Sequence, residues 1–425
     1  MPNYKKKKHN RFLGNYKKPI SKKSKKNNSA DDVAQNEDYY EKSSNLKVVE
    51  GKRRERLRKF KIASFFVIIA VATVIILETA LPAGIIKSAD MAIKLMGKGE
   101  YPIELASTET KNVVTKGKYY HILGNTHIDV FSLSGKQLLH YEHGLENPVL
   151  KTSAAYSLVY DQGGTEVLVF DISDKVYSFV TKNPILTAAI SDRGNFAVST
   201  TSKKYAAQVT VYKLDGTEIY EWYSAEDMVN NVALSSNGKK LAVSVLNSGD
   251  GANISSKISV LNFSSATPLY TESFKNTLVY RIESAFSSYF TVVTSNTVKT
   301  YKWSNFKLNS YNNDYSISFF KSYKNGYIAV FARENDKTDN RVVLLNKKGE
   351  KTADFTYRET ISDISAQGKH IYCMSETVIS VLDESGKTLN TVDCGFGGRE
   401  ICVLNSDFVA VISDNKIEKI KLSKE

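Results

Sequence analysis

The chain has 425 residues, of which 42% are hydrophobic, so it is long enough to bury a sizeable core. Its formal net charge is +13, but residues 1–61 contain twenty Lys or Arg against seven Asp or Glu and account for all of this excess. The rest of the chain is neutral, which excludes nucleic-acid binding through a basic surface of the folded part.

Residues 1–61 are predicted to form a disordered, basic tail in the cytoplasm. The segment is rich in Lys, Ser and Asn, as in Lys22–Ala30, and few apolar residues interrupt it. Such a composition cannot bury enough surface to offset the chain entropy lost on folding. A solvated tail is one interpretation. The other is binding to anionic membrane lipids, which attract basic side chains near the surface.

Residues 62–86 contain one ionisable side chain, Glu78, and are predicted to form a single transmembrane helix. At a rise of about 1.5 Å per residue they span about 37 Å, enough to cross a hydrocarbon core. Seven basic residues lie within 51–61, so the N-terminus is expected in the cytoplasm and the C-terminal part outside. A cleavable signal peptide is the alternative, but a leader this long is not typical of one.

Residues 87–100 are predicted to form a short stalk that two glycines keep from extending as a helix. The part of the chain that follows has three cysteines, Cys373, Cys394 and Cys402. An odd number excludes a complete disulfide framework. We interpret all three as small buried side chains, although Cys394 and Cys402 are close enough in sequence to pair.

A pattern with a period near forty residues repeats eight times after residue 118. Each copy has a β-rich run, a tight turn and a second run that ends in an apolar or aromatic residue. These final residues are 37 to 49 positions apart: Phe131, Phe170, Tyr212, Leu261, Tyr301, Leu345, Leu382 and Ile420. Such a period in an all-β sequence is typical of propeller blades. We therefore expect residues 101–425 to form an all-β, eight-bladed β-propeller, with seven blades plus an irregular hairpin as the alternative.

The eighth copy ends without a candidate for the outer strand that follows each of the first seven copies. A spare β-rich segment, Tyr101–Ala106, lies at the opposite end of the domain. We predict that this segment completes the last blade, because joining both ends of the domain removes two open sheet edges.

A second phrase precedes several of the repeated strands. Its clearest copies are Ala189–Val198 and Ala233–Val243, which share a Ser-x-x-Gly turn followed by Ala-Val. The phrase resembles the hairpin of WD40-type and TolB-type propellers, over residues 101–425. No copy carries the Trp-Asp or Gly-His pair of WD40 repeats, so their side-chain network is not carried over. The whole layout is similar to uncharacterised membrane-anchored β-propeller proteins of Gram-positive bacteria, a resemblance that implies placement at the membrane and no particular activity.

Four of the six histidines fall in the first copy of the repeat. If Gly124 and Asn125 form the turn, His121 and His127 face each other on neighbouring strands and His140 lies on the next one. Imidazoles arranged in this way could hold zinc. The chain has no HExxH or Cys-x-x-Cys motif, so solvent-facing strand residues are the alternative, and no cofactor is predicted.

No catalytic residues are predicted. The chain lacks Gly-x-Ser-x-Gly, a P-loop and a Rossmann glycine cluster. Aspartates beside strand ends are interpreted as turn residues, because their side chains bond the local backbone. These aspartates are Asp129, Asp161, Asp171, Asp215, Asp314 and Asp383.

The candidate binding residues lie in loops that share one face in propeller geometry. Aromatic residues beside polar loops are typical of protein-binding or glycan-binding surfaces. The candidates are Lys204, Tyr205, Trp222, Tyr223, Asn247, Asp250, Asn253, Arg333, Glu334, Asp336 and Arg399. Two pairs with oxygen-bearing side chains, Asp250 with Asn253 and Glu334 with Asp336, could also hold calcium, although neither stretch matches an EF-hand.

These features favour a membrane-anchored, extracytoplasmic propeller that acts as a protein-binding or glycan-binding scaffold at the cell surface. Its partner is expected to be a cell-surface or membrane protein, or a wall polymer. The alternative is an enzyme, a lyase or hydrolase acting on cell-wall glycans or peptides through the central channel or the first-blade histidines. A propeller fold alone does not choose between them.

Overall fold

In the computed structural model, the chain divides into two compact units, Met1–Lys87 and Ser88–Glu425. The residues described are Lys61, Ser64, Gly97, 99–105, 110–247, 254–333, 336–395 and 397–422. Apart from Lys61 and Ser64, the predicted tail and transmembrane segment therefore lie outside the described residues, as does most of the predicted stalk. Within these ranges, no helix is both long and apolar enough to span a membrane.

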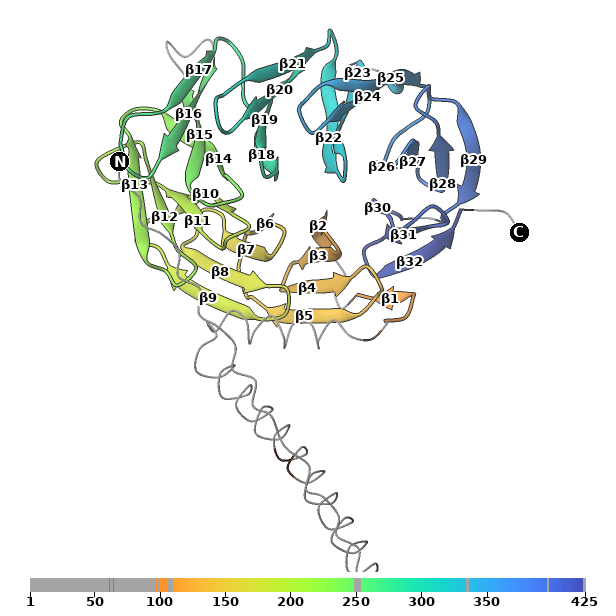
Figure 1. The fold of residues 1–425 in the computed structure, drawn as a ribbon, viewed down its shortest axis with the longest axis horizontal. Helices are drawn as coiled ribbons and strands as arrows, with labels where there is room; N and C mark the ends of the chain where they lie inside the picture. Colours follow the sequence, from red (N-terminus) through yellow and green to blue (C-terminus); the bar gives the residue numbers. More distant parts are fainter. Residues whose placement is uncertain are drawn as a thin grey trace, which may run out of the picture. The chain divides into compact units, whose positions relative to one another are not determined.

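Eight four-stranded antiparallel sheets form a ring of blades around a central axis (Figure 1). In the first seven blades, four consecutive strands pair in chain order, with the first strand innermost. Blade one comprises β2 (Thr110–Lys116), β3 (Tyr119–Gly124), β4 (His127–Ser132) and β5 (Gln137–Glu142). Blade two comprises β6 (Pro148–Thr152), β7 (Tyr156–Asp161), β8 (Glu166–Asp171) and β9 (Lys175–Val180). Blade three comprises β10 (Ile185–Ile190), β11 (Phe196–Thr200), β12 (Ala207–Tyr212) and β13 (Glu218–Ser224).

Blade four comprises β14 (Met228–Leu234), β15 (Lys240–Asn247), β16 (Ser255–Asn262) and β17 (Tyr270–Phe274). Blade five comprises β18 (Arg281–Phe286), β19 (Tyr289–Val293), β20 (Thr297–Lys302) and β21 (Leu308–Asn312). Blade six comprises β22 (Ser316–Tyr323), β23 (Gly326–Arg333), β24 (Asp336–Asn346) and β25 (Lys351–Tyr357). Blade seven comprises β26 (Asp363–Gln367), β27 (His370–Met374), β28 (Val378–Leu382) and β29 (Thr388–Asp393).

The eighth blade is built from both ends of the domain, as predicted. It pairs β30 (Glu400–Val403), β31 (Phe408–Ile412) and β32 (Lys416–Lys421) with β1 (Ile103–Glu104). The register places Ile103 opposite Ile417, and the Leu105 backbone N–H donates to the Asn415 carbonyl at 2.8 Å. The prediction of eight blades rather than seven is therefore confirmed, and all eight repeated runs are the third strands of their blades.

The Ser-x-x-Gly turns explain two of the hairpins between first and second strands. The N–H of Gly194 donates to the Ser191 carbonyl at 3.0 Å, and Gly238 makes the same bond to Ser235 at 2.7 Å. Both glycines have a positive φ, +84° and +66°, which residues with a Cβ seldom adopt.

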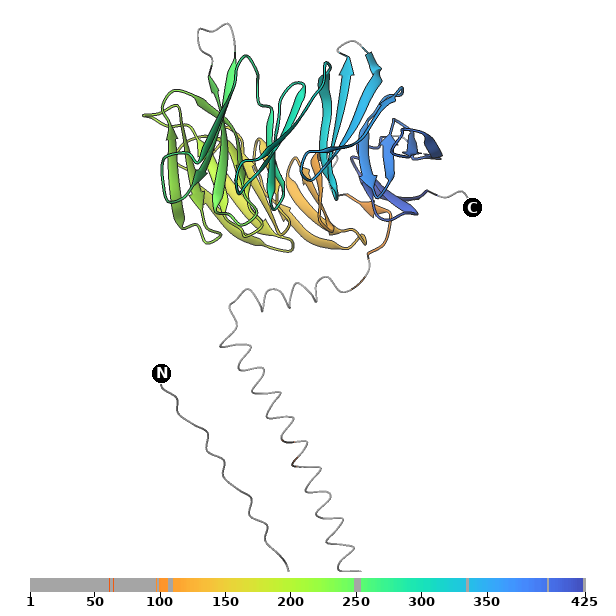
Figure 2. The same ribbon diagram turned by 45° about the horizontal axis from the view of Figure 1, so that its top comes forward.

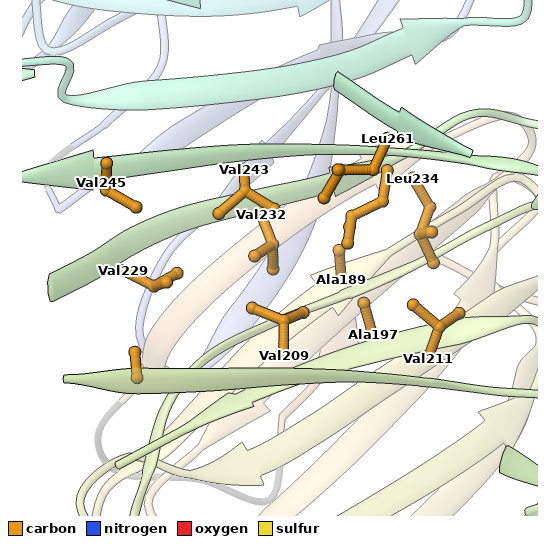
Figure 3. Packing of buried hydrophobic residues seen from close by; sticks show 12 residues of the cluster. Ala189, Ala197, Val209, Val211, Val229, Val232, Leu234, Val243, Val245 and Leu261 are labelled. Atoms are coloured by element: carbon orange, nitrogen blue, oxygen red, sulfur yellow. The ribbon is translucent and has the colours of Figure 1, made fainter. Parts of the chain in front are cut away.

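The core lies between neighbouring blades, where the face of one sheet packs on the next. Between blades three and four, small residues such as Ala189, Ala197 and Val209 meet Val232 and Val243 (Figure 3). The ring closes in the same way, since Ile103 of the last blade packs near Tyr120 of the first. Because neighbouring blades pack closely, alanine and valine fit between them where larger side chains would clash.

All three cysteines are buried and unpaired. The interpretation of Cys373, Cys394 and Cys402 as small buried side chains is confirmed, and Cys394 does not pair with Cys402.

Candidate functional site

One face of the ring carries both the hairpins between second and third strands and the connections from blade to blade. These segments share a face because antiparallel neighbours alternate in direction, so second and fourth strands end on the same side. We call this side the connecting face. The hairpin β23–β24, light blue in Figure 2, projects from it.

Three predicted binding residues meet on the connecting face of blade three. The rings of Tyr205 and Tyr223 lie 4.8 Å apart, and Lys204 Nζ lies 5.3 Å from the Tyr205 ring centre. Tyr223 Oη donates a hydrogen bond to Glu221 Oε2 at 2.9 Å, and the Tyr223 side chain is exposed. Trp222 is half-buried and packs against the core cluster between blades three and four, because neighbouring residues of a strand point to opposite faces.

The remaining candidates do not join this group. In blade four, Asn247 Nδ2 donates to Asp227 Oδ1 at 2.7 Å. In blade six, Arg333 Nη2 donates to Tyr315 Oη at 3.2 Å, with the guanidinium 5.3 Å from the Tyr315 ring centre. The predicted residues are therefore spread around the ring rather than gathered in one pocket.

The two calcium hypotheses fall largely on residues that the structure does not describe. Asp250, Asn253 and Glu334 lie outside the described residues. Asp336 is the first residue of β24, where it pairs with Arg333 in the strand register. Both hypotheses stay predictions.

Exposed apolar side chains gather on the connecting face of four consecutive blades, two to five. They stand at strand ends or in the loops beside them: Val180, Tyr223, Met228, Ile254 and Tyr280. Only Tyr223 of this set was singled out from the sequence. We call these five residues the apolar set. The other large exposed hydrophobic residues among those described, Leu269, Leu308 and Leu389, lie where outer strands begin, on the opposite face.

The innermost strands of all eight blades line a central cavity of about 610 Å³. Five cationic side chains and three carboxylates face it, an excess of two positive charges: Lys116, Lys151, Arg281, Lys321, Arg399, Glu283, Asp363 and Glu400. Of these, the sequence singled out Arg399 alone. A charged residue within a first strand, where the repeat favours small apolar residues, is the signal that would have found the others.

A three-membered ion network ties together blades six, seven and eight. Lys321 Nζ lies 2.8 Å from Asp363 Oδ2 and 3.0 Å from Glu400 Oε1. Asp363 Oδ2 also accepts the Ile401 backbone N–H at 2.7 Å. Burial opposes the charge of Lys321, but the two carboxylates outweigh it and raise the lysine pKa. Burial raises the pKa of Glu400 against the opposing attraction of Lys321.

Arg399 is fixed where the ring closes. Its Nη1 donates to the Thr110 carbonyl at 3.0 Å, and its Nε lies 2.8 Å from Asp414 Oδ1. It therefore joins the last blade to the first at the edge of the cavity.

A second charged group contains Glu283, whose Oε2 lies 3.3 Å from Arg281 Nε. Burial would raise the Glu283 pKa, but Arg281, Lys116 and Lys151 hold it below its ordinary value. Burial and then Arg281 lower the pKa of Lys151, with Glu283 partly offsetting them. These four side chains, from blades one, two and five, thus share one electrostatic environment across the cavity.

The zinc hypothesis is wrong in its geometry. The β3–β4 turn is centred on Asn125 and Thr126, so His121 pairs with Val130 and lies on the opposite sheet face from His127. Among the described residues, no group of three His, Cys, Asp or Glu side chains is arranged to hold a metal ion.

His127 and His140 instead flank the buried carboxylate of Asp129. His127 Nε2 lies 3.2 Å from Asp129 Oδ2, and His140 Nδ1 lies 2.7 Å from Asp129 Oδ1. These residues stand on β4 and β5, the two outer strands of blade one, away from the cavity. The geometry therefore separates the first-blade histidines from the channel that an enzyme would use.

Several other aspartates act as turn residues, as predicted. Asp171 Oδ1 accepts the Ser173 N–H at 2.9 Å, and Asp383 Oδ1 accepts the Ser385 N–H at 2.9 Å. Such bonds fix the local backbone after the third strand of a blade.

Eight four-stranded blades around a charged channel define the chain as a β-propeller. Residues 99–422 match the model of the DUF5711 family, a family of unknown function, and the chain belongs to it. No curated protein matches the sequence.

Solved structures share the fold at low identity. A eukaryotic initiation factor is 13% identical, with a TM-score of 0.50, over 78% of this chain and 89% of that one. BamB from Moraxella catarrhalis is 12% identical, with a TM-score of 0.47, over 77% and 98%. The Cps50 (Swd1) propeller domain of Myceliophteria thermophila is 11% identical, with a TM-score of 0.45, over 75% and 99%.

Proposed function

We propose that this protein is a membrane-anchored binding module that presents its propeller outside a Gram-positive cell and docks a protein on the connecting face of blades two to five. The observation that carries the proposal is the apolar set, five exposed apolar side chains on four consecutive blades of one face. Exposed apolar residues that gather on one surface are typical of protein-interaction sites.

The surroundings of the apolar set also fit a protein partner. Tyr223 packs against the tilted ring of Tyr205 and donates a hydrogen bond to Glu221, so little side-chain freedom remains for a partner to restrict. Tyrosine supplies both apolar area and a polar tip, and it is enriched among the residues that dominate binding energy. The charged side chains of Lys204 and Glu221 contact this aromatic pair.

The membrane placement rests on the sequence. An apolar segment at 62–86 follows a basic segment at 51–61. That order favours a cytoplasmic N-terminus and an external propeller. A membrane-anchored propeller and a membrane-protein partner are both confined to the same membrane surface. This confinement increases their effective concentration, so even a weak interaction can form.

Photocrosslinking in living cells tests this proposal. A benzophenone amino acid at position 223 of the full-length protein is expected to give a defined protein adduct. Met228→Ser with Tyr280→Ser, in the same crosslinking chain, is expected to remove that adduct because it removes apolar contact area.

The matched control carries the crosslinker at Leu389, an exposed apolar position on the opposite face. The same adduct from position 389 would contradict docking on the connecting face. A glycan adduct in place of a protein would contradict the choice of partner.

A further inference from the structure

In the part of the chain that the structure describes, the ammonium groups of two lysines that face the central cavity have no hydrogen-bond or ion-pair partner. Lys116 is the last residue of β2, and Lys151 stands one residue before the end of β6. Each of the other three cations of the cavity is paired: Arg281 with Glu283, Lys321 with Asp363 and Glu400, and Arg399 with Asp414. Both backbones pair within their sheets, but no described atom forms a hydrogen bond or ion pair with the Nζ atom of either lysine. An ammonium group taken out of water without a counter-charge is unfavourable, so an anion in the cavity would stabilise both lysines.

The cations converge on one region. Lys116, Lys151 and Arg281 come from three different blades, yet all three act on the carboxylate of Glu283. One carboxylate among three cations leaves an excess of two positive charges there. Two charges are what a phosphate monoester neutralises near neutral pH, and a carboxylate neutralises one of them.

We propose that the central cavity binds a phosphorylated or carboxylated sugar, whose oxyanion is held by Lys116, Lys151 and Arg281. This site shares Tyr280 with the apolar set, but it is argued from the charges of the cavity and does not depend on the docking proposal.

The remaining lining residues support a sugar rather than a simple ion. The cavity volume of about 610 Å³ lies within the range of small-molecule sites and far exceeds the volume of a phosphate ion. Asn112, Thr152 and Ser322 add amide and hydroxyl groups that can bond sugar hydroxyls. Tyr280 and Phe319 add aromatic surface for the apolar face of a sugar ring. Tyr280 is exposed and also lines the cavity, so it marks the entrance from the connecting face.

Isothermal titration calorimetry on the purified full-length protein in detergent micelles tests the site. The probes are glucose 6-phosphate, glucuronate, inorganic phosphate and glucose. Saturable binding of glucose 6-phosphate or glucuronate is expected, and comparison of the two identifies the preferred oxyanion. Lys151→Gln and Lys116→Gln are each expected to weaken that binding about tenfold or more, since each removes a charge-assisted contact.

Lys369→Gln is the matched control, because this lysine is exposed on the β26–β27 hairpin and does not line the cavity. It is expected to leave the affinity unchanged. Melting curves of each variant, recorded without ligand, separate lost binding from lost folding.

Three outcomes would overturn the proposal. The first is no saturable binding of either sugar anion, and the second is undiminished binding by the Lys116→Gln, Lys151→Gln double variant. The third is that glucose or inorganic phosphate binds as tightly as the sugar anions. Tight binding of glucose would show that the oxyanion adds no affinity, and tight binding of phosphate would show that the sugar adds none.

Discussion

The imidazole of His121 lies between blades one and two, where its Nδ1 atom is 2.7 Å from Ser157 Oγ. Its Nε2 atom is buried and has no hydrogen-bond partner among the described residues. Protonation would add a charge and a second buried N–H to this site. Burial, with a smaller contribution from Lys116, therefore lowers the pKa of His121 to about 4.

This histidine makes the fold sensitive to acid. The unfolded chain takes up its proton near pH 6.5 and the folded chain only near 4, so stability is complete above 6.5 and falls across this window. The loss from this residue is about 3 kcal/mol. Urea unfolding at pH 7 and pH 4.5 is expected to show a smaller pH dependence for His121→Asn than for wild type. His370→Asn, at an exposed histidine, is expected to keep the wild-type dependence, and an unchanged His121→Asn would refute the assignment.

Lys151 gives a second prediction, in which removal of a charged side chain stabilises the protein. Its pKa is lowered, so its charge destabilises the folded state at neutral pH, and this loss disappears as pH rises toward the unfolded value of 10.5. In buffer free of multivalent anions, Lys151→Gln is expected to melt at a higher temperature than wild type at pH 7. The difference is expected to shrink as pH rises toward 10. A variant that melts below wild type at pH 7 would show that the ammonium is satisfied.

At the scale of single residues, the sequence predicted only part of the side-chain contacts. Four histidines in one copy of the repeat indicated a cluster, but the β3–β4 pairing puts His121 and His127 on opposite sheet faces. Any two-residue turn between these strands has this result, because moving the turn by one position shifts the pairing by two residues and leaves each side chain on its face. The two imidazoles would face each other only across a turn with an odd number of residues. The partner of His127 was Asp129, which the sequence had suggested only as a turn residue.

At the scale of elements, the carboxylate of Asp363 links the innermost strands of blades six, seven and eight, one strand from each blade. Asp363→Asn keeps the size of the side chain but leaves Lys321 with only Glu400, so we expect a loss of about 3 kcal/mol. Asp354→Asn is the matched control, since its partners Arg341 and Lys351 are largely exposed, and a loss below about 1 kcal/mol is expected. Chemical denaturation measures both. Equal losses would mean that the network in the cavity contributes no more than a surface pair.

The closing strand β1 gives a test with a control on the same strand. Ile103 is buried against the eighth blade, whereas Glu104 points to solvent. Ile103→Ala is expected to lower the unfolding free energy by about 2 kcal/mol or more, as large-to-small core changes do. Glu104→Ala is expected to change it by less than about 0.5 kcal/mol. If both variants unfold like wild type, the two-residue strand does not hold the ring closed.

The elements themselves were largely predictable. Strands three and four of each blade carry alternating or continuous apolar runs, as in Glu166–Asp171, and a period near forty aligned them. The first strands were less predictable because short runs such as Glu400–Val403 mix charged and apolar residues. Their charges are tolerated because they face a cavity and pair across blades, which no single repeat reveals.

For the whole molecule, the buried cysteines make membrane topology measurable. Burial raises the pKa of all three thiols, that of Cys402 to about 11, so little reactive thiolate is present at neutral pH. A single Ala266→Cys change, at an exposed position of the β16–β17 connection, is therefore expected to be the dominant site of maleimide labelling. In intact cells, a membrane-impermeant maleimide is expected to label this variant and to spare a Ser24→Cys variant in the predicted tail. The reverse pattern would invert the proposed orientation.

The placement of binding residues was the least predictable property of the whole molecule. The sequence located several loops of the connecting face, but it could not say that Trp222 packs inward while Tyr223 points outward, or that Met228 and Tyr280 stand near the same face. These facts depend on how neighbouring blades pack against each other, which is a property of the whole propeller.

The pairing of Ile103 with Ile417 also has a consequence for biosynthesis. The first strand of the domain leaves the ribosome more than three hundred residues before its partner, so the nascent chain carries an unpaired strand until β32 has been synthesised. A chain that stops before β32 (Lys416–Lys421) lacks the strand that pairs with β1 and leaves the ring open, with two unpaired sheet edges. Such edges are prone to pair with other chains, so β32 protects the domain from aggregation as well as closing the ring.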